Sequence, residues 1–353
     1  MDFAAIAARL QGKAAQVALR MPLSWINVAT GGNPVSVDGF TLDQRVQWML
    51  QVFERSGRPP LRSLPLPDAR RSYERFVADL SAPLSPFDQP EIGEIVNRTI
   101  PGPEGRLPMR LYRPAGLGAS RLPAILFLHG GSWTVGSLDA YDHPLRLLAA
   151  RSGCLVASLD YRLAPEHKFP AGLDDAVAGW RWLAESADAL GADRSRLVIA
   201  GDSAGGNLTL ATLLALKDRK LRLPAGGIPI SPATDFTLTS EALKSVSDPI
   251  ISSRTMPEFR DRYLPKTDPR EPLASPLFGD YRGLPPLLIQ LGEHEMLRDD
   301  AIRVAKKARA DGTPVTLEIW PGMVHVFQIR GLPESREAIR RIGAFMNSKT
   351  ATK

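Results

Sequence analysis

The chain has 353 residues, of which 44% are hydrophobic and 23% are charged, a balance typical of a folded globular protein rather than a disordered one. Lys and Arg number 44 against 38 Asp and Glu, which gives a formal net charge of +6 at pH 7. The cations are scattered, without a long basic run or an alternation with aromatic residues. We therefore expect no nucleic-acid partner.

Hydrophobic runs in the chain are too short to cross a membrane. The longest candidate, from Leu122 to Leu128, has the length of a strand, whereas a membrane-spanning helix needs ~18 apolar residues. Residues 1–20 have basic residues at helical spacing, which is unlike a secretory leader. Cys154 is the one cysteine, which excludes an intramolecular disulfide and a cysteine-based zinc site. We expect a cytoplasmic protein without integral membrane association.

Residues 1 to about 100 differ in texture from the rest of the chain. Apolar residues recur at helical spacing near the start and again around Val46 to Phe53. Proline-rich connectors follow at residues 57–60 and 82–86, where proline interrupts helices. We expect an irregular helical segment here rather than the opening of a sheet.

From residue 109 onward the pattern alternates between strands and helices. Short aliphatic runs predict strands at Met109–Tyr112, Ala124–Leu128, Leu155–Leu159, Leu197–Ala200, Gly227–Ile230, Leu287–Leu291 and Val315–Trp320. Helical stretches between them are expected from Leu173 to Ala187 and at Asn207–Leu216, Asp299–Asp311 and Ser335–Met346. This alternation predicts an α/β fold with a doubly wound, mostly parallel sheet.

One long stretch interrupts the alternation. Residues 231 to about 283 are rich in Pro, Ser and Asp and contain one short predicted helix near Met256–Tyr263. An insertion of that length in a compact α/β core is usually functional, and we expect a lid or cap.

The segment Gly201–Gly206 contains a Gly-x-Ser-x-Gly pattern centred on Ser203. The pattern alone is weak evidence, but it follows the apolar run Leu197–Ala200 and opens a helical stretch, which is the context of a nucleophile elbow. So sharp a turn leaves no room for flanking Cβ atoms, which explains Gly201 and Gly205. We expect Ser203 to be a nucleophile above the carboxyl edge of the sheet. The alternative is a helix N-cap serine with incidental glycines.

A serine nucleophile needs a base, which on such a fold is a histidine later in the chain. Two of the five histidines follow Ser203, namely His294 and His325. His325 lies just after the run Val315–Trp320, so its loop belongs to the same edge of the sheet. His294 lies beside the candidate acids and is expected to be a loop residue. We therefore expect His325 to be the base.

The acid that orients this base should lie in the loop after Leu287–Leu291, where four carboxylates compete. Asp299 and Asp300 precede a helix and are explained as N-cap and first-turn acids. Glu293 follows the strand directly and could face away from the site. Glu295, in the middle of the loop, is favoured as the acceptor of the imidazole Nδ1–H.

Acyl transfer also needs donors for the oxyanion of the tetrahedral intermediate. Gly130 and Gly131 follow the run that ends at Leu128, and glycines at this position let bare N–H groups approach a substrate oxygen. Ala204, directly after the nucleophile, supplies a further N–H. We expect Gly130, Gly131 and Ala204 to form the oxyanion hole.

Several motifs together resemble the hormone-sensitive-lipase-like family of α/β-hydrolase carboxylesterases, the bacterial family IV lipolytic enzymes. They are His129–Trp133, Asp160–Ala171, Gly201–Gly206 and the loops of Glu295 and His325. The similarity runs from about residue 105 to the C-terminus. It implies an α/β-hydrolase catalytic domain at 101–353, with a helical cap formed by an N-terminal segment, 1–100, and by the insertion at about 231–283.

Two residues depart from the family pattern. Ser132 replaces the third glycine of the usual His-Gly-Gly-Gly motif, and Glu295 stands where most members carry Asp. Because a Glu side chain is one methylene longer than Asp, the loop that carries it must sit further back.

The resemblance implies a serine carboxylesterase that hydrolyses small, moderately hydrophobic esters with short acyl chains through an acyl-enzyme intermediate. It implies a small-molecule ester as the partner, and no metal or organic cofactor is needed. One alternative is an amidase or a lactone hydrolase with the same triad, and another is a non-catalytic ligand-binding protein of the same fold. A homodimer is compatible with the sequence, but no residue pattern points to one.

Overall fold

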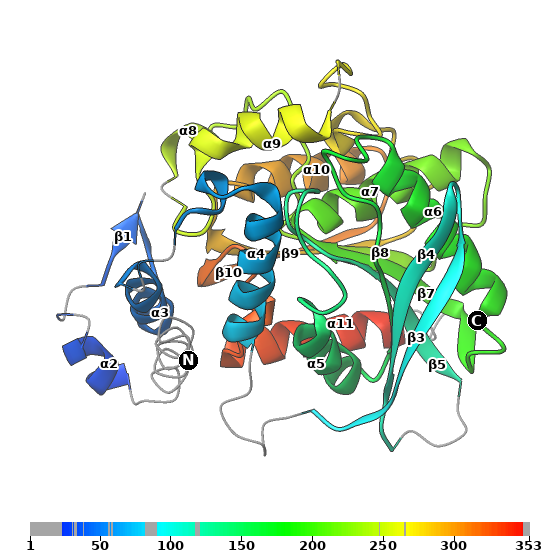
Figure 1. The fold of residues 1–353 in the computed structure, drawn as a ribbon, viewed down its shortest axis with the longest axis horizontal. Helices are drawn as coiled ribbons and strands as arrows, with labels where there is room; N and C mark the ends of the chain where they lie inside the picture. The colour runs from blue at the N-terminus through cyan, green and yellow to red at the C-terminus, as the bar shows by residue number, and fades with distance from the viewer. Residues whose placement is uncertain are drawn as a thin grey trace.

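An eight-stranded sheet forms the centre of the protein in a computed structural model (Figure 1). The structure describes residues 23–348 except 30, 32–33, 38, 56, 58, 82–89, 117–120, 247 and 265. The strand order is β10-β9-β8-β7-β5-β6-β4-β3. The strands are β3 (Ile92–Gly102), β4 (Gly105–Pro114), β5 (Leu122–Leu128), β6 (Leu155–Leu159), β7 (Ala192–Asp202), β8 (Gly226–Ile230), β9 (Leu287–His294) and β10 (Val315–Val324).

The sheet is parallel from β10 to β6 and antiparallel only at the β6–β4 and β4–β3 pairs. The predicted doubly wound, mostly parallel sheet is therefore confirmed. Because β5, β6 and β8 are buried along their whole length, their sequences are continuous apolar runs rather than alternating ones.

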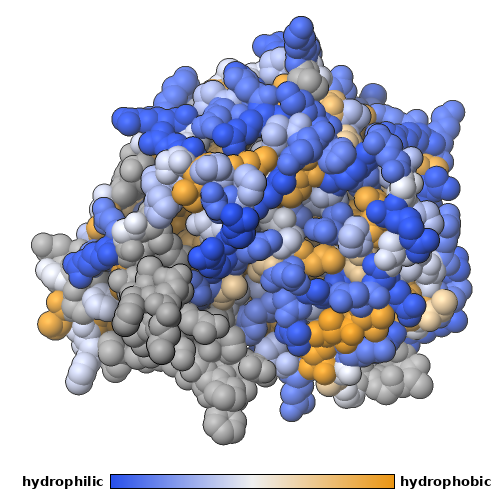
Figure 2. Space-filling view, viewed as in Figure 1, coloured by the Kyte–Doolittle hydropathy of each residue, from blue (hydrophilic) through white to orange (hydrophobic). Residues whose placement is uncertain are grey.

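Helices cover both faces of the sheet and divide the core into two layers (Figure 1). One layer packs the sheet against α6 (Ala171–Ser186), α7 (Ala204–Asp218) and α10 (Arg298–Ala310). The other packs it against α5 (Asp142–Ser152) and α11 (Pro333–Ser348). Figure 2 shows that the face turned to the viewer is mainly hydrophilic, with separate hydrophobic areas. Burial of the apolar helix stripes against the sheet is what holds the parallel strands in one frame.

From residue 23 to residue 81 the described part of the N-terminal segment is mainly helical, as expected. It contains α2 (Leu23–Ala29), α3 (Gln44–Arg55) and α4 (Leu66–Ser81), with a short hairpin of β1 (Ser36–Val37) and β2 (Phe40–Thr41) between the first two. Its apolar residues, with those of β10 and the loop after it, form a third cluster that includes Met49 and Leu80. The helical periodicity near the start of the chain lies outside the described residues.

One expectation for this segment is wrong. Residues 92–102 form β3, which pairs with β4 at the edge of the main sheet, so the boundary expected at residue 100 falls inside a strand. The reason is that an edge strand has solvent on one side. Glu94, Arg98 and Thr99 are exposed, so β3 has no continuous apolar run to mark it.

The insertion after β8 holds α8 (Ala242–Ser245), a 3-10 turn at Ser253–Thr255 and α9 (Met256–Tyr263). The short helix predicted at Met256–Tyr263 is thus confirmed. In Figure 1, α8 and α9 lie across the end of the molecule toward which α4 points.

Candidate active site

Ser203 occupies the sharp bend between β7 and α7. Its backbone has φ of +54° and ψ of −114°, a conformation that L-residues rarely adopt and that is typical of strained functional turns. A Cβ on Gly205 would lie 1.9 Å from the carbonyl oxygen of Leu128, and one on Gly201 would lie 2.4 Å from that of Gly205. Both glycines are therefore sterically required, as the sequence predicts.

The alternative interpretation of Ser203 as a helix cap is excluded by its hydrogen bonding. Ser203 holds the N-cap position of α7, but its side chain makes no capping hydrogen bond. Ser203 instead lines a pocket whose wall also includes His325. The N-terminus of α7 adds a partial positive charge at this point, which favours negative charge developing on a bound group.

His325 follows β10 and is held by Glu295. The His325 Nδ1 lies 2.6 Å from the Glu295 Oε2, and both side chains are buried. A carboxylate at this distance accepts the Nδ1–H and so fixes the tautomer in which Nε2 is the free acceptor. The pair therefore has the chemistry of a general base with its orienting acid.

Two hydrogen-bond donors hold the Glu295 carboxylate in position. The Ser231 hydroxyl donates to Oε1 at 2.9 Å, and the Gly292 N–H donates to the same oxygen at 2.5 Å. The Ser231 Oγ also accepts the N–H of Val326, at 3.3 Å. One buried hydroxyl thus links the acid to the residue after the base. Sequence reasoning missed Ser231, although its position at the end of the apolar run Gly227–Ile230 was a usable signal.

The other three candidate carboxylates have different hydrogen-bond partners. Glu293 accepts the N–H of Gly322 at 3.0 Å. Asp300 is fully buried and its Oδ2 accepts the N–H groups of Thr234 and Asp235, while Asp299 accepts the Ser240 hydroxyl. Of the four candidates, Glu295 is the one that contacts His325 in the described part of the chain.

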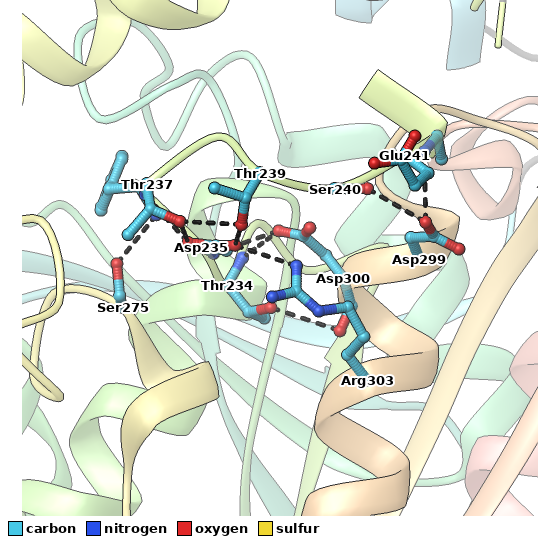
Figure 3. A network of polar contacts seen from close by, with 12 residues as sticks. Thr234, Asp235, Thr237, Thr239, Ser240, Glu241, Ser275, Asp299, Asp300 and Arg303 are labelled. Atoms are coloured by element: carbon cyan, nitrogen blue, oxygen red, sulfur yellow. Dashed lines mark hydrogen bonds and ion pairs between the residues drawn. The ribbon is translucent and has the colours of Figure 1, made fainter. Parts of the chain in front are cut away.

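Asp299 and Asp300 connect α10 to the insertion (Figure 3). The expectation that one of them caps the helix is wrong, because α10 begins at Arg298 with Leu297 in the N-cap position. Both acids lie in the first turn and direct their carboxylates to the insertion's backbone. Arg303, one turn further along, pairs with Asp235 at 2.9 Å. Burial raises the pKa of Asp300 to about 7, against hydrogen bonds from backbone N–H groups that lower it.

The loop after β5 contains the expected oxyanion donors, but their N–H groups are not equivalent. The Gly130 N–H already donates to Asp202 Oδ1 at 3.0 Å and to the Tyr141 hydroxyl at 3.1 Å. By contrast, the N–H groups of Gly131 and Ala204 have no hydrogen-bond partner among the described residues. The N–H of Gly130, which was expected to bind the oxyanion, is therefore already hydrogen-bonded to Asp202 and Tyr141.

Backbone geometry explains why this loop needs its glycines. Gly131 has φ of +118°, and a Cβ there would lie 2.2 Å from the carbonyl oxygen of Val135. Ser132, in place of the family's third glycine, has φ of +52°, in the left-handed region that a non-glycine residue can still enter. Its N–H also lacks a partner among the described residues.

The pocket in front of Ser203 has a volume of about 440 Å³ and is mostly apolar. The N-terminal segment contributes residues from Pro60 to Leu80, and the insertion contributes Ile250, Ile251, Ser252, Thr255 and Phe259. Gly131, Ser132, Asp202, Ser203, His325 and Arg330 form the rest of its described wall together with neighbours of these residues. The two stretches that the sequence marks as unusual therefore enclose one pocket.

Other motif residues serve the fold. His129 is buried, stacks on Tyr161, and contacts the Gly130 carbonyl at 2.8 Å. Burial lowers the pKa of His129 to about 4, so it is neutral at pH 7. His294 is buried edge-on against Phe40, away from the pocket wall. Cys154 is buried, and burial raises its pKa to about 11.

The described residues contain neither a cluster of metal ligands nor a membrane-spanning helix. No group of three or more His, Cys, Asp or Glu side chains there is arranged to hold a metal ion. Within the same residues, no helix combines the length and apolar character needed to span a membrane.

The chain is similar to several proteins of known activity. Residues 125–329 match a family model described as alpha/beta hydrolase fold. The chain is 35% identical to the carboxylic ester hydrolase LipN of Mycobacterium tuberculosis over 92% of this chain and 89% of that protein. It is 43% identical to an acetyl-hydrolase of Streptomyces hygroscopicus, over 64% of this chain and 76% of the relative. An ethyl acetate hydrolase of Pseudomonas putida is 36% identical, over 77% and 86% of the two chains.

Two solved structures of esterases have a similar fold. An ester hydrolase from the metagenome of Lake Arreo, complexed with a bipyridine phosphonate derivative, superposes with a TM-score of 0.82 at 34% identity, over 88% of this chain and all of that one. An esterase of Pyrobaculum calidifontis gives 0.79 at 33% identity, with the same coverage.

Proposed function

The chain belongs to the α/β-hydrolase family and is a carboxylic ester hydrolase, and we propose that Ser203, His325 and Glu295 are its catalytic triad. The observation that carries this proposal is the pairing of His325 with Glu295 beside the strained Ser203 bend, in one pocket. The assignment of each residue to a step follows from its contacts.

In the first half of the reaction, the Ser203 oxygen attacks the ester carbonyl carbon while His325 Nε2 takes the hydroxyl proton. Glu295 stabilises the imidazolium through Nδ1–H without itself being protonated. Collapse of the tetrahedral intermediate breaks the C–O bond to the alcohol, which leaves with the proton from Nε2. In the second half, water attacks the acyl-serine, gives its proton to the same nitrogen, and releases the acid and a protonated Ser203.

The oxyanion formed in each half needs donors, and the free N–H groups of Gly131 and Ala204 suit this role. The N–H of Ser132 is a further candidate. Gly130 contributes differently in this proposal, because its N–H binds Asp202 and thereby anchors the loop to the end of β7. The sequence-based assignment of Gly130 as a donor would require that this hydrogen bond break when substrate binds.

Short esters fit the enclosed part of the pocket. Helix α4 and the insertion both line it, so we propose that they act together as a cap, with the catalytic unit beginning at β3. A cavity of about 440 Å³ accommodates a small ester. Relatives named as hydrolases of acetyl groups and of ethyl acetate support the same size range. The cytoplasmic location and the homodimer remain predictions.

A panel of p-nitrophenyl esters of rising acyl length, run beside a matched anilide and a lactone, tests this function. We expect kcat/KM to be highest for acyl chains of about two to six carbons and to fall for longer chains, in line with the relatives named as acetyl-hydrolase and ethyl acetate hydrolase. A higher kcat/KM on the anilide or the lactone would favour the alternative enzymes. Binding of esters without turnover would favour the ligand-binding protein.

A further inference from the structure

A buried cation, Arg330, lies in the wall of the proposed active-site pocket. It follows the 3-10 turn at Phe327–Ile329, five residues after His325, and only 2% of its surface is exposed. It lines the same pocket as Ser203. The proposed ester hydrolysis gives this side chain no role.

The guanidinium has few partners for its five N–H donors. One nitrogen donates to the carbonyl oxygen of His325 at 3.2 Å, and another reaches the sulfur of Met49 at 3.9 Å, which is a weak acceptor. The Nε atom is buried without any hydrogen-bond partner among the described residues. A buried charged donor without an acceptor is costly to a fold, so a ligand that brings an acceptor to this guanidinium would gain a favourable hydrogen bond.

Nearby acids do not supply this acceptor. Asp248 and Glu295 are close enough to affect the electrostatics of Arg330, but no carboxylate of the described residues lies within ion-pair distance of it. Glu295 is engaged by His325, Ser231 and Gly292. The Asp248 carboxylate accepts three backbone N–H groups, those of Ile250, Ile251 and Met296.

Arg330 keeps its charge in this environment. Burial lowers its pKa to about 10, and the negative charge of Asp248 opposes that effect. The guanidinium is therefore protonated at neutral pH. It faces a pocket whose other wall residues are mainly apolar, such as Leu61, Phe76 and Ile251, so its field is poorly screened by polar neighbours.

We propose that Arg330 forms a subsite for a carboxylate carried by the substrate, so that the preferred esters are small ones that also bear a free carboxyl group. A planar guanidinium suits a carboxylate because the two can form parallel hydrogen bonds. This inference deepens the proposed function and rests on it. The ester carbonyl would lie at Ser203 while the distant carboxylate meets the cation.

Two pairs of isosteric esters test the subsite, with kcat/KM measured by titration of released acid. Monoethyl succinate is paired with ethyl 4-methylpentanoate, which places the carboxylate in the acyl half. The 3-acetoxypropionate anion is paired with isoamyl acetate, which places it in the alcohol half. In each pair an isopropyl group replaces the carboxylate, so size is held constant.

In at least one pair, we expect the wild-type enzyme to have a kcat/KM ratio of charged to neutral ester of one or more. Arg330→Met should lower that ratio by at least about 10-fold, which is the effect of losing a charged hydrogen bond. Because both esters use the same triad, damage to His325 through its carbonyl contact cancels in the ratio. Arg330→Lys should restore part of the ratio by restoring the charge.

Arg62→Met is the matched control, since Arg62 is an exposed cation at the rim of the same pocket. We expect it to change the ratio by less than about 2-fold, because an exposed charge is screened by water. Equal effects of the two substitutions would show long-range attraction and overturn the subsite.

If the Arg330→Met protein does not fold, the wild-type ratios decide, and ratios below one in both pairs overturn the proposal. A ratio that Arg330→Met leaves within about 2-fold also overturns it. If neither charged nor neutral esters are hydrolysed, the proposed function itself has failed. If only the neutral ones are hydrolysed, the carboxylate subsite alone has failed.

Discussion

Glu295 is separated from three other acids by only a few residues, and what distinguishes it is the place of its carboxylate. Glu295 directly follows β9 and contacts His325, whereas Glu293 lies within β9 and accepts the N–H of Gly322. Sequence position alone favours Glu295 as the middle of the loop. It cannot show the Ser231 hydroxyl and the Gly292 N–H that hold the side chain in place, because Ser231 follows the neighbouring strand β8 and Gly292 contributes its backbone from within β9.

Glu295→Gln should lower kcat on p-nitrophenyl acetate by about 10²–10⁴-fold, because an amide cannot stabilise the imidazolium and favours the wrong tautomer. Stopped-flow or steady-state rates check this, with the melting temperature as a measure of folding. Glu293→Gln is the control and should cost less than about 10-fold. The opposite order of the two effects would move the acid to Glu293.

Gly130 and Gly131 differ at the same scale, although they are neighbours in a single motif. The sequence marks both as glycines after a strand, which correctly locates the loop. It cannot show that Asp202 and Tyr141 engage one N–H and leave the next free, since those partners come from β7 and from the turn before α5. Arg330 escaped prediction for a similar reason, because its burial depends on packing against the N-terminal segment.

At the scale of elements, the β7–α7 bend is the most demanding part of the fold. The strand–turn–helix pattern could be predicted from the sequence because only glycine fits at the two positions that flank the bend, Gly201 and Gly205. Strand β3 was missed because its edge position leaves half of it exposed. The rule that predicts a central strand, a continuous apolar run, does not hold at an edge.

Gly205→Ala should reduce the free energy of unfolding by at least ~3 kcal/mol or prevent folding, because the new methyl group overlaps the Leu128 carbonyl. Chemical denaturation measures the change. Gly312→Ala is the matched control: Gly312 has φ of +86° but nothing within 4 Å of an added Cβ. It should cost about 1 kcal/mol from backbone strain alone. Similar costs at the two positions would contradict the steric account.

The hydrogen bonds between Asp300 in α10 and the backbone of the insertion predict a pH-dependent stability. Burial raises the pKa of Asp300 from 3.8 to about 7, so between these values the folded protein binds more protons than the unfolded chain. By linkage, the contribution of Asp300 to stability falls as the pH rises from about 4 to 7. Asp300→Asn removes this titration. We therefore expect the melting temperature of the variant minus that of the wild type to be higher at pH 8 than at pH 5.

The difference between the two proteins isolates Asp300 from the other titrating groups, and it should be on the order of 1–4 kcal/mol across this interval. Asp311→Asn is a control at a half-buried acid in the C-cap position of the same helix, and the pKa of Asp311 is lowered, chiefly by the N–H of Tyr281. It should not gain stability as the pH rises. A flat difference for Asp300→Asn would show that the carboxyl is ionised in the fold.

At the scale of the whole molecule, the N-terminal segment and the insertion meet over one pocket although they are far apart in sequence. Each is irregular beside the regular strand–helix alternation. The length of the insertion predicted a cap there, whereas the cap role of the N-terminal segment was implied by the family resemblance. The wall that they form together could not be predicted, because it depends on how α4 packs against α5 and the 3-10 turn after His325.

Leu80→Ala should shift the preferred acyl chain of p-nitrophenyl esters longer by about two carbons, since Leu80 is buried in the pocket wall and its removal opens space there. Leu42→Ala is the matched control. Leu42 belongs to the same apolar cluster as Leu80 but does not line the pocket, so it should lower stability and leave the chain-length profile unchanged. A shift with both variants would mean that the cap is loosened rather than the pocket enlarged.

The central claim is that one hydroxyl, activated by the buried imidazole–carboxylate pair, carries the acyl group. Mass spectrometry of protein labelled with a fluorophosphonate tests it most directly. We expect one phosphonate per chain, on the peptide that contains Ser203, with labelling and ester hydrolysis both lost in Ser203→Ala at an unchanged melting temperature. Full hydrolysis by Ser203→Ala, or a label on another residue of the active protein, would contradict the account.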